Sequence, residues 1–441
     1  MRENAACALG AGMGSLAVAW LGLYGFAWND YEAEAQPAVS ALVHGQTAQF
    51  LRLAPSYGGS LVERAPFALA PGLWGGGELA VYRMLALPCL LAAAALAVWL
   101  CARMRAAGRR ALARALAVGI CVANPLTLQA LELGHPEEAL GACLCVAAVL
   151  LAARGRAVWA GVALGLAIAN KEWALLAVGP VLLALLAREP APLSPVRASA
   201  RRRLALCLGA AGAVAGAILA PLLLVSAGGF AAGVKGAASP GGQLFQPWQV
   251  WWFLGHHGAP VRQEGTPLPG YRVGPEWTAS VSHPLIVALG VALPLALWLV
   301  AQRTGRRLTQ GDALLALALA LLARCVLDTW DIGYYMLPFL LALLTWECLG
   351  GGRPLLTTVA ALLPWIVLAR LSAQGISPDV QAALFLAWTL PLAGVLALRL
   401  YAPHLAPAWQ SNETRHEREL SAGWQGVAHR AAGRVRARLP A

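Results

Sequence analysis

Long apolar runs alternate with short polar segments along most of the chain. The runs are rich in leucine, alanine, valine and glycine, and they recur from Ala5 to Arg399. A helix of about 20 apolar residues spans the hydrocarbon core of a bilayer, and repeated runs of this kind are typical of a bundle of such helices. The pattern predicts an all-α, polytopic membrane protein with about twelve transmembrane helices.

Helix ends are expected where the apolar runs meet charged or turn-forming residues. The first run, residues 5–27, follows only Arg2 and has no clear small-residue cleavage site, so we expect an uncleaved first helix. Further helices are expected at about 79–100, at 112–131, up to 153 and at 204–225, with the last five after residue 283.

The segment between Arg156 and Arg188 is too short for two complete crossings. Only about 31 residues separate these arginines, whereas two crossings need roughly 20 each. We therefore predict two short helices that turn at residues 170–173 (Asn-Lys-Glu-Trp), below the outer surface. Because exposed backbone at that depth is tolerated only inside protein or in a wet cavity, we also expect a cavity that opens outward.

The charge of the chain is small in amount and uneven in distribution. Only 12% of the residues are charged and 59% are hydrophobic, and the formal net charge is +12. Such a composition leaves too little polar surface for a soluble fold. Most arginines cluster in alternate loops, namely Arg103, Arg105, Arg109, Arg110, Arg114, Arg154, Arg156, Arg197, Arg201 to Arg203, Arg303, Arg306, Arg307, Arg353 and the tail after Arg399. The positive-inside rule assigns these loops to the cytoplasm, and no nucleic-acid partner is expected.

The intervening loops carry most of the acids and the only two lysines, Lys171 and Lys235. This asymmetry predicts a cell-membrane protein with both termini in the cytoplasm and its chemistry on the extracytoplasmic side. Residues 1–403 form one transmembrane domain with two long outer loops, at about 28–78 and 226–283. The tail, residues 404–441, is basic and is expected to be disordered or to lie on anionic lipid.

The first outer loop opens with three acids, Asp30, Glu32 and Glu34. A positioned aspartate is suited to act as a general base toward a hydroxyl group. The simpler alternative is a solvated acidic loop. The same three acids offer oxygen ligands for a divalent cation, although their number alone does not establish a metal site, and no other cofactor is indicated.

Two later outer segments place ionisable groups near the outer half of the membrane. Residues 134–138 include His135, Glu137 and Glu138, and residues 170–173 include Lys171. An ionisable group at the bilayer centre costs roughly 2.5–3.5 kcal/mol on insertion scales, so such groups usually have a partner or a function.

Lys171 is suited to neutralise a lipid phosphate as a compact point charge, with Arg83 or Arg324 as a second cation. The alternative is a structural ion pair between Lys171 and Glu172 or Glu137.

Another outer turn brings two acids and two phenols to a helix end. Asp328 and Asp331 are followed by Tyr334 and Tyr335, and carboxylates with aromatic faces suit a sugar ligand. Interfacial tyrosines with a helix-capping aspartate are the alternative. The second outer loop contains two adjacent histidines, His256 and His257. They are further candidates for a metal or proton site, although no other ligand stands at a spacing that supports one.

Several of these segments, in this order, resemble the multi-spanning C-type glycosyltransferases (GT-C fold), and most closely glycosyltransferase family 87. They are residues 29–31, 134–138, 169–174, 327–331 and 334–338. The resemblance covers about residues 5–399. It implies an inverting glycosyltransferase, of mannose or a related sugar, that uses a polyprenyl-phosphate sugar as donor and a lipid-linked or envelope glycan as acceptor.

The resemblance also assigns Asp30 as the catalytic aspartate of the first loop. Members of the family can use a histidine from a later outer segment, but this chain has Tyr334 and Tyr335 where a Tyr-His pair would be expected. The second catalytic group is therefore open among His256, His257 and His135.

Two other classes of function are compatible with the sequence. A transporter or lipid flippase also uses recessed charges and broken helices, although the two halves of this chain show no inverted repeat and its two outer loops are long. A non-catalytic partner in a cell-envelope complex is the third possibility.

Overall fold

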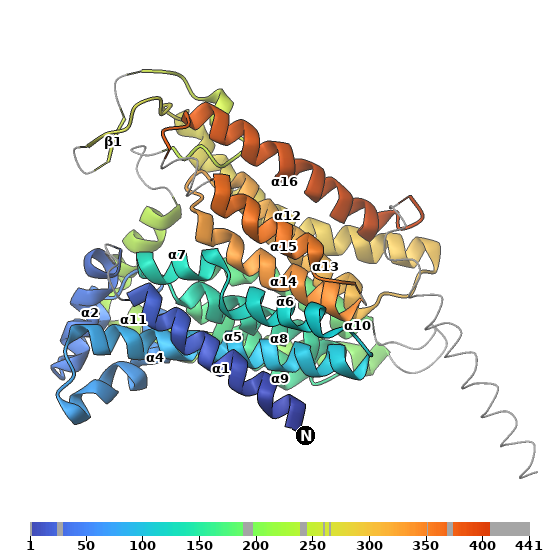
Figure 1. The fold of residues 1–441 in the computed structure, drawn as a ribbon, viewed down its shortest axis with the longest axis horizontal. Coiled ribbons are helices and arrows are strands. Elements are labelled where there is room, and N and C mark those ends of the chain that lie inside the picture. The colour runs from blue at the N-terminus through green and yellow to red at the C-terminus, as the bar shows by residue number, and fades with distance from the viewer. Residues whose placement is uncertain are drawn as a thin grey trace, which may run out of the picture.

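The computed structural model describes residues 2–23, 30–187, 197–238, 245–258, 261–263, 266–350, 352–367 and 374–405. These residues are mainly helical (Figure 1). The described strands, β1 (Arg262–Gln263) and β2 (Thr266–Pro267), form a two-residue antiparallel pair. The helical fold class predicted from the sequence is confirmed.

The helices of the first half are α1 (Arg2–Leu23), η1 (a π-helix, Tyr31–Ala35), α2 (Gln36–Val43), α3 (Thr47–Leu53), α4 (Gly58–Leu69), η2 (Ala70–Trp74), α5 (Glu78–Ala106), α6 (Ala111–Val122), α7 (Pro125–Leu133), α8 (Glu137–Ala153), α9 (Ala157–Asn170), η3 (Glu172–Ala177) and α10 (Val178–Leu186). Those of the second half are α11 (Arg197–Ala238), η4 (Trp252–Leu254), α12 (Glu276–Thr304), α13 (Gln310–Leu327), η5 (Gly333–Met336), α14 (Leu337–Leu349), α15 (Leu355–Pro364) and α16 (Pro378–Tyr401). Elements η2 to η5 are 3-10 helices.

Six helical spans in the described part of the chain are long and apolar enough to cross a membrane, and one of them, Ala111–Leu133, consists of α6 and α7. The six spans are Glu78–Ala106, Ala111–Leu133, Ala200–Val225, Glu276–Thr304, Gln310–Leu327 and Pro378–Tyr401. Shorter apolar helices occupy Cys7–Leu23, Ala157–Asn170, Glu172–Leu186, Gly333–Leu349 and Leu355–Val367. The chain is thus a helical membrane protein, while the count of twelve crossings and the sidedness of its loops remain predictions.

The core of the bundle lies around α8, α13 and α14. The α13 span is 78% buried, whereas the α11 span is only 17% buried and those of α12 and α16 are 28% buried. In Figure 1 helices α12 to α16, yellow to red, lie together against the layer that contains α1, α5 and α9. A helix that is apolar on all sides is stable only against other protein or lipid, so the open faces of α11, α12 and α16 fit a lipid environment.

The third predicted helix is broken in the structure. Residues 111–133 form two helices, and the break lies at Asn124 and Pro125. The Asn124 side chain accepts hydrogen bonds from the backbone N–H groups of Leu126 and Thr127, at 2.9 and 3.0 Å, and so caps α7. Proline at the first helical position has no N–H to satisfy, which makes this pair a favourable helix start.

The second outer loop is shorter than predicted at both ends. Helix α11 continues to Ala238, beyond the predicted end at residue 225, and α12 begins at Glu276, before the predicted start after residue 283. Glycines in this part of α11 weaken a helix without ending it, and α12 accommodates Pro284 in its interior. The predicted first outer loop contains the short helices η1, α2, α3, α4 and η2. The predicted end of the first helix, at residue 27, lies outside the described residues.

Candidate functional site

The chain breaks at Lys171, between two short apolar helices, as the residue count predicted. Helix α9 ends at Asn170, Lys171 has an extended backbone (φ −155°, ψ 138°), and η3 follows. The Asn170 side chain fixes the break, because its amide donates to the Glu137 carbonyl at 3.0 Å and its oxygen accepts from the Ser60 hydroxyl at 2.7 Å. These hydrogen bonds connect the end of α9 to α4 and α8.

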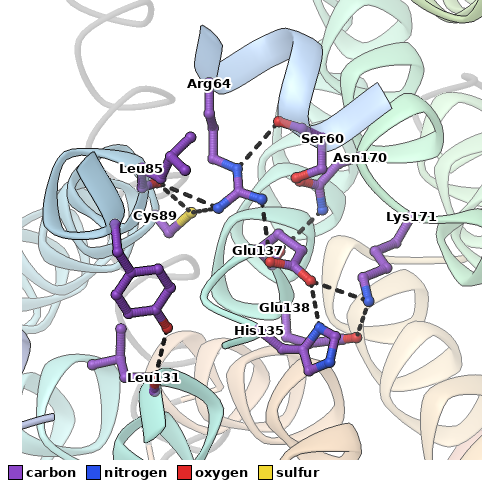
Figure 2. A network of polar contacts seen from close by, with 11 residues as sticks. Ser60, Arg64, Leu85, Cys89, Leu131, His135, Glu137, Glu138, Asn170 and Lys171 are labelled. Carbon is purple, nitrogen blue, oxygen red and sulfur yellow. Dashed lines mark hydrogen bonds and ion pairs between the residues drawn. The ribbon is translucent and has the colours of Figure 1, made fainter. Parts of the chain in front are cut away.

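A buried carboxylate, that of Glu137, lies at the centre of the polar network in Figure 2. Its Oε2 lies 3.2 Å from Arg64 Nη2, and its Oε1 lies 2.8 Å from His135 Nδ1. Lys171 Nζ lies 3.2 Å from the same Oε1 and 3.4 Å from Oε1 of Glu138. The Glu137 side chain is fully buried. Because an isolated buried charge is costly, the three cationic groups around Glu137 are what make its burial tolerable.

His135 connects this buried network to Asp30. Its Nε2 lies 3.4 Å from Asp30 Oδ2 while its Nδ1 faces Glu137. The Asp30 side chain is 36% exposed and that of His135 only 6%. Since both ring nitrogens face carboxylate oxygens, the doubly protonated imidazolium satisfies both contacts. Asp30 is thus an accessible carboxylate that contacts a buried cation, the imidazolium of His135.

A glycine makes the approach of these two segments possible. Gly134 has a positive φ of 96°, and a Cβ at this position would lie 2.6 Å from the backbone nitrogen of Tyr31. Any other residue would be strained and would push the His135 loop away from the segment that carries Asp30.

The pKa of His135 reflects its surroundings. Burial and the nearby Lys171 lower it, but the hydrogen bonds to Asp30 and Glu137 outweigh them and raise the pKa from 6.5 to about 9. The imidazole is therefore charged at neutral pH.

Aromatic rings enclose the cations of the site. The His135 ring stacks on Tyr334 with a centroid distance of 5.1 Å, and Lys171 Nζ lies 4.3 Å from the centre of the Tyr57 ring. The guanidinium of Arg324 lies 4.4 Å from the centre of the Tyr335 ring. Contacts of this kind stabilise cations at desolvated sites, and they bring Tyr334, Tyr335 and Arg324 to the same region as Glu137.

The turn after α13 adds two carboxylates. Asp328 Oδ1 accepts a hydrogen bond from the Trp330 N–H at 3.0 Å, and its Oδ2 lies 3.8 Å from His283 Nε2. Asp331 is fully buried, and within the described residues neither of its carboxylate oxygens has a hydrogen-bond partner. Burial, with a further contribution from Asp328, raises the pKa of Asp331 well above its usual value. Such a group is prepared to bind a proton or a hydroxyl-bearing ligand.

Other predicted residues lie elsewhere. The Arg83 guanidinium lies 4.2 Å from the centre of the Trp20 ring. His256 pairs with Val273 through the backbone, and His257 Nε2 lies 3.8 Å from Asp379 Oδ2. No described contact joins these residues to Glu137. The part of the chain that the structure describes also holds no group of three His, Cys, Asp or Glu side chains that could bind a metal ion.

The main residue missing from the sequence-based site is Arg64. Its Nε donates to the Ser60 carbonyl at 3.1 Å and its Nη1 to the Leu85 carbonyl at 3.3 Å, so the guanidinium joins α4, α5 and α8. The available signal was a single arginine in a largely apolar stretch, residues 58–69, which form α4. Without a helix assignment there, the sequence did not connect it to Glu137.

Comparison of the chain with protein-family models, with curated proteins and with solved structures finds no match in any of the three. The residues of the site therefore indicate its chemistry. They offer an accessible carboxylate, a charged imidazole next to it, buried cations and a fully buried acid, Asp331.

Replacement of Glu137 by glutamine is expected to destabilise the protein strongly. The substitution keeps the shape but leaves Arg64 and Lys171 buried beside a neutral group, and breaking such a pair costs about 3 kcal/mol or more. Chemical unfolding of the purified protein in detergent micelles measures this loss. Glu132→Gln, at a partly exposed position on α7, is the matched control and should stay within about 0.5 kcal/mol of the parent. Equal stability of the two variants would contradict the proposed role of Glu137.

The raised pKa of His135 predicts a specific pH dependence of stability. Folding favours the protonated ring, so this contribution is fully present below pH 6.5, the unfolded pKa, and is lost as the pH rises through about 9. The melting temperature should fall across this window in the parent and fall less in His135→Gln. His44→Gln, at an exposed histidine, should keep the parental slope. Identical slopes for all three proteins would exclude a charged His135.

Proposed function

We propose that the protein is a membrane glycosyltransferase that moves a sugar, mannose or a close relative, from a polyprenyl-phosphate donor to a lipid-linked or envelope glycan acceptor. The reaction would take place at the extracytoplasmic face of the cell membrane with inversion at the sugar carbon. The order of the outer segments, which resembles the C-type glycosyltransferases of family 87, supports this proposal.

The observation that supports the proposal most strongly is the setting of Asp30. Its carboxylate is partly exposed, and it contacts His135, which belongs to the buried charge network around Glu137. A general base must be reachable by its substrate and held in place, and Asp30 is 36% exposed with its carboxylate 3.4 Å from His135. A solvated acidic loop would have no need of this support. Glu32, two residues further along, is exposed and makes no comparable contact with the network among the described residues.

In the proposed reaction Asp30 accepts the proton of the acceptor hydroxyl as its oxygen attacks the anomeric carbon. The bond between that carbon and the phosphate oxygen breaks, and the polyprenyl phosphate leaves with the electron pair. The charged His135 stabilises the aspartate before the transfer and holds its orientation. Most of the acceleration then comes from placement and charge stabilisation.

The cation proposed for the leaving phosphate is Arg324. Its Nη1 is buried and has no hydrogen-bond partner within the described residues, whereas Lys171 is already held by two carboxylates at 3.2 and 3.4 Å. The ion pair of Lys171 with Glu137, one of the two interpretations of the sequence, is thus realised, and its role in the proposal is to support the site. Asp328, Asp331, Tyr334 and Tyr335 remain the candidates for contacts to the sugar.

Transport of a lipid or solute is the second candidate function. The observation that favours it is Asp331, a fully buried acid whose two oxygens lack hydrogen-bond partners in the described structure. Acids of this kind also serve as proton sites in transporters. Liposomes separate the two functions, because they report sugar transfer and movement across the membrane independently.

Asp30→Asn is expected to lower the rate of sugar transfer by about 10²- to 10⁴-fold, because it removes a general base. Purified protein in liposomes, supplied with polyprenyl-phosphate mannose and candidate acceptors, measures the transfer. Glu32→Gln removes a carboxylate from the same exposed segment and should keep the parental rate. Transfer that survives Asp30→Asn unchanged would exclude this base, and transport without transfer by the parent protein would favour the second candidate.

Arg324→Gln is expected to raise the KM for the donor by about 10- to 150-fold, since a charge-assisted hydrogen bond to phosphate contributes roughly 1.5–3 kcal/mol. The same liposome assay, run over a range of donor concentrations, gives KM and kcat separately. Arg324→Lys keeps the charge and should recover part of the affinity. Arg83→Gln is the control at the arginine beside Trp20, and an equal rise of KM in this variant would argue against a specific phosphate contact.

A further inference from the structure

An apolar groove runs between α5 and α8, away from the network around Glu137. Its volume is about 340 Å³, within the range of small-ligand sites. The α5 side is lined by Ala92, Ala95, Leu96 and Trp99, and the α8 side by Cys143, Leu144, Ala147, Leu150, Leu151 and Arg154. The groove exists because alanines stand at its middle, where larger side chains would fill the space between the helices.

One end of the groove is cationic. Arg154 is the only charged residue in its lining, and its guanidinium lies 5.3 Å from the centre of the Trp99 ring. Helices α5 and α8 both end here, since Trp99 and Arg154 lie near their C-termini, and the exposed Arg103 and Arg105 follow in the last turn of α5. The other end, at Ala92 and Cys143, is apolar.

We propose that this groove binds a phospholipid with an anionic headgroup. One acyl chain would lie along the alanines of α5 and α8, and the headgroup phosphate would meet Arg154. An apolar slot with one cationic end matches the two parts of such a lipid. Basic pockets between transmembrane helices are known to recognise anionic headgroups. The arginine-rich loops at this end belong to the side that the charge pattern assigns to the cytoplasm, so the lipid would come from the inner leaflet. The proposal is independent of the catalytic one.

Native mass spectrometry of the full-length protein tests the site. The protein is delipidated in detergent and titrated with phosphatidylglycerol or, in parallel, with phosphatidylcholine. Phosphatidylglycerol should bind about fivefold more tightly than phosphatidylcholine, whose headgroup has no net charge. Arg154→Gln should weaken binding about fivefold, in line with about 1 kcal/mol per basic residue near anionic lipid. Ala147→Trp should abolish it by filling the groove, and Ala95→Phe, a smaller change on the other wall, provides the same test if the tryptophan variant does not fold.

Arg156→Gln is the matched control, because it removes the same charge two residues away without lining the groove. Its binding should equal that of the parent. Equal loss in Arg154→Gln and Arg156→Gln would overturn the proposal in favour of general surface attraction, and so would equal binding of the two lipids. Displacement of phosphatidylglycerol by equimolar polyprenyl phosphate would also overturn it, since the groove would then be a site for the donor lipid.

Discussion

Neutralisation of one buried carboxylate is the interaction on which the described site depends. Glu137 is fully buried and lies within 3.2 Å of charged groups from Arg64, His135 and Lys171. These partners come from α4, from the turn before α8 and from the break after α9. In a medium of low polarity each charge needs the others, so the position of every member is determined by the rest. The accessible Asp30 obtains its geometry from this network through His135.

The network also explains why the local structure departs from regular helices at particular residues. In an uninterrupted helix the Lys171 side chain would have a different direction. The extended backbone at this residue turns its amine toward Glu137 and Glu138. The positive φ of Gly134 brings the His135 loop against the segment of Asp30. Irregular backbone inside a membrane bundle is tolerated where it is buried in protein. Here the break at Lys171 is held in place by the Asn170 side chain, which bonds to the Glu137 carbonyl and to the Ser60 hydroxyl.

Much of the helical pattern could be predicted from the sequence, because hydropathy and residue counts are properties of the chain alone. Counting residues predicted the break near Lys171, and the outer segments gave His135, Glu137 and Asp30. Arg64 was missed, since hydropathy does not say which helices touch: lipid is as apolar as leucine, so contacts depend on close packing and polar pairing. The break at Asn124 and Pro125 was not predicted, because the apolar run at 112–131 continues through it. The position of His257, beside Asp379, depends on the fold of a loop without periodicity.

The central ion pairs have a consequence for how the chain is made. Arg64, Glu137 and Lys171 belong to segments that leave the ribosome one after another, yet each needs the others in order to lie in an apolar setting. Until Lys171 emerges, Glu137 has only part of its final complement of positive charge. We therefore expect the N-terminal helices to enter lipid less favourably one by one than together. Held together, or kept near water, until α9 has entered, they would close around their charges in a late step of membrane insertion.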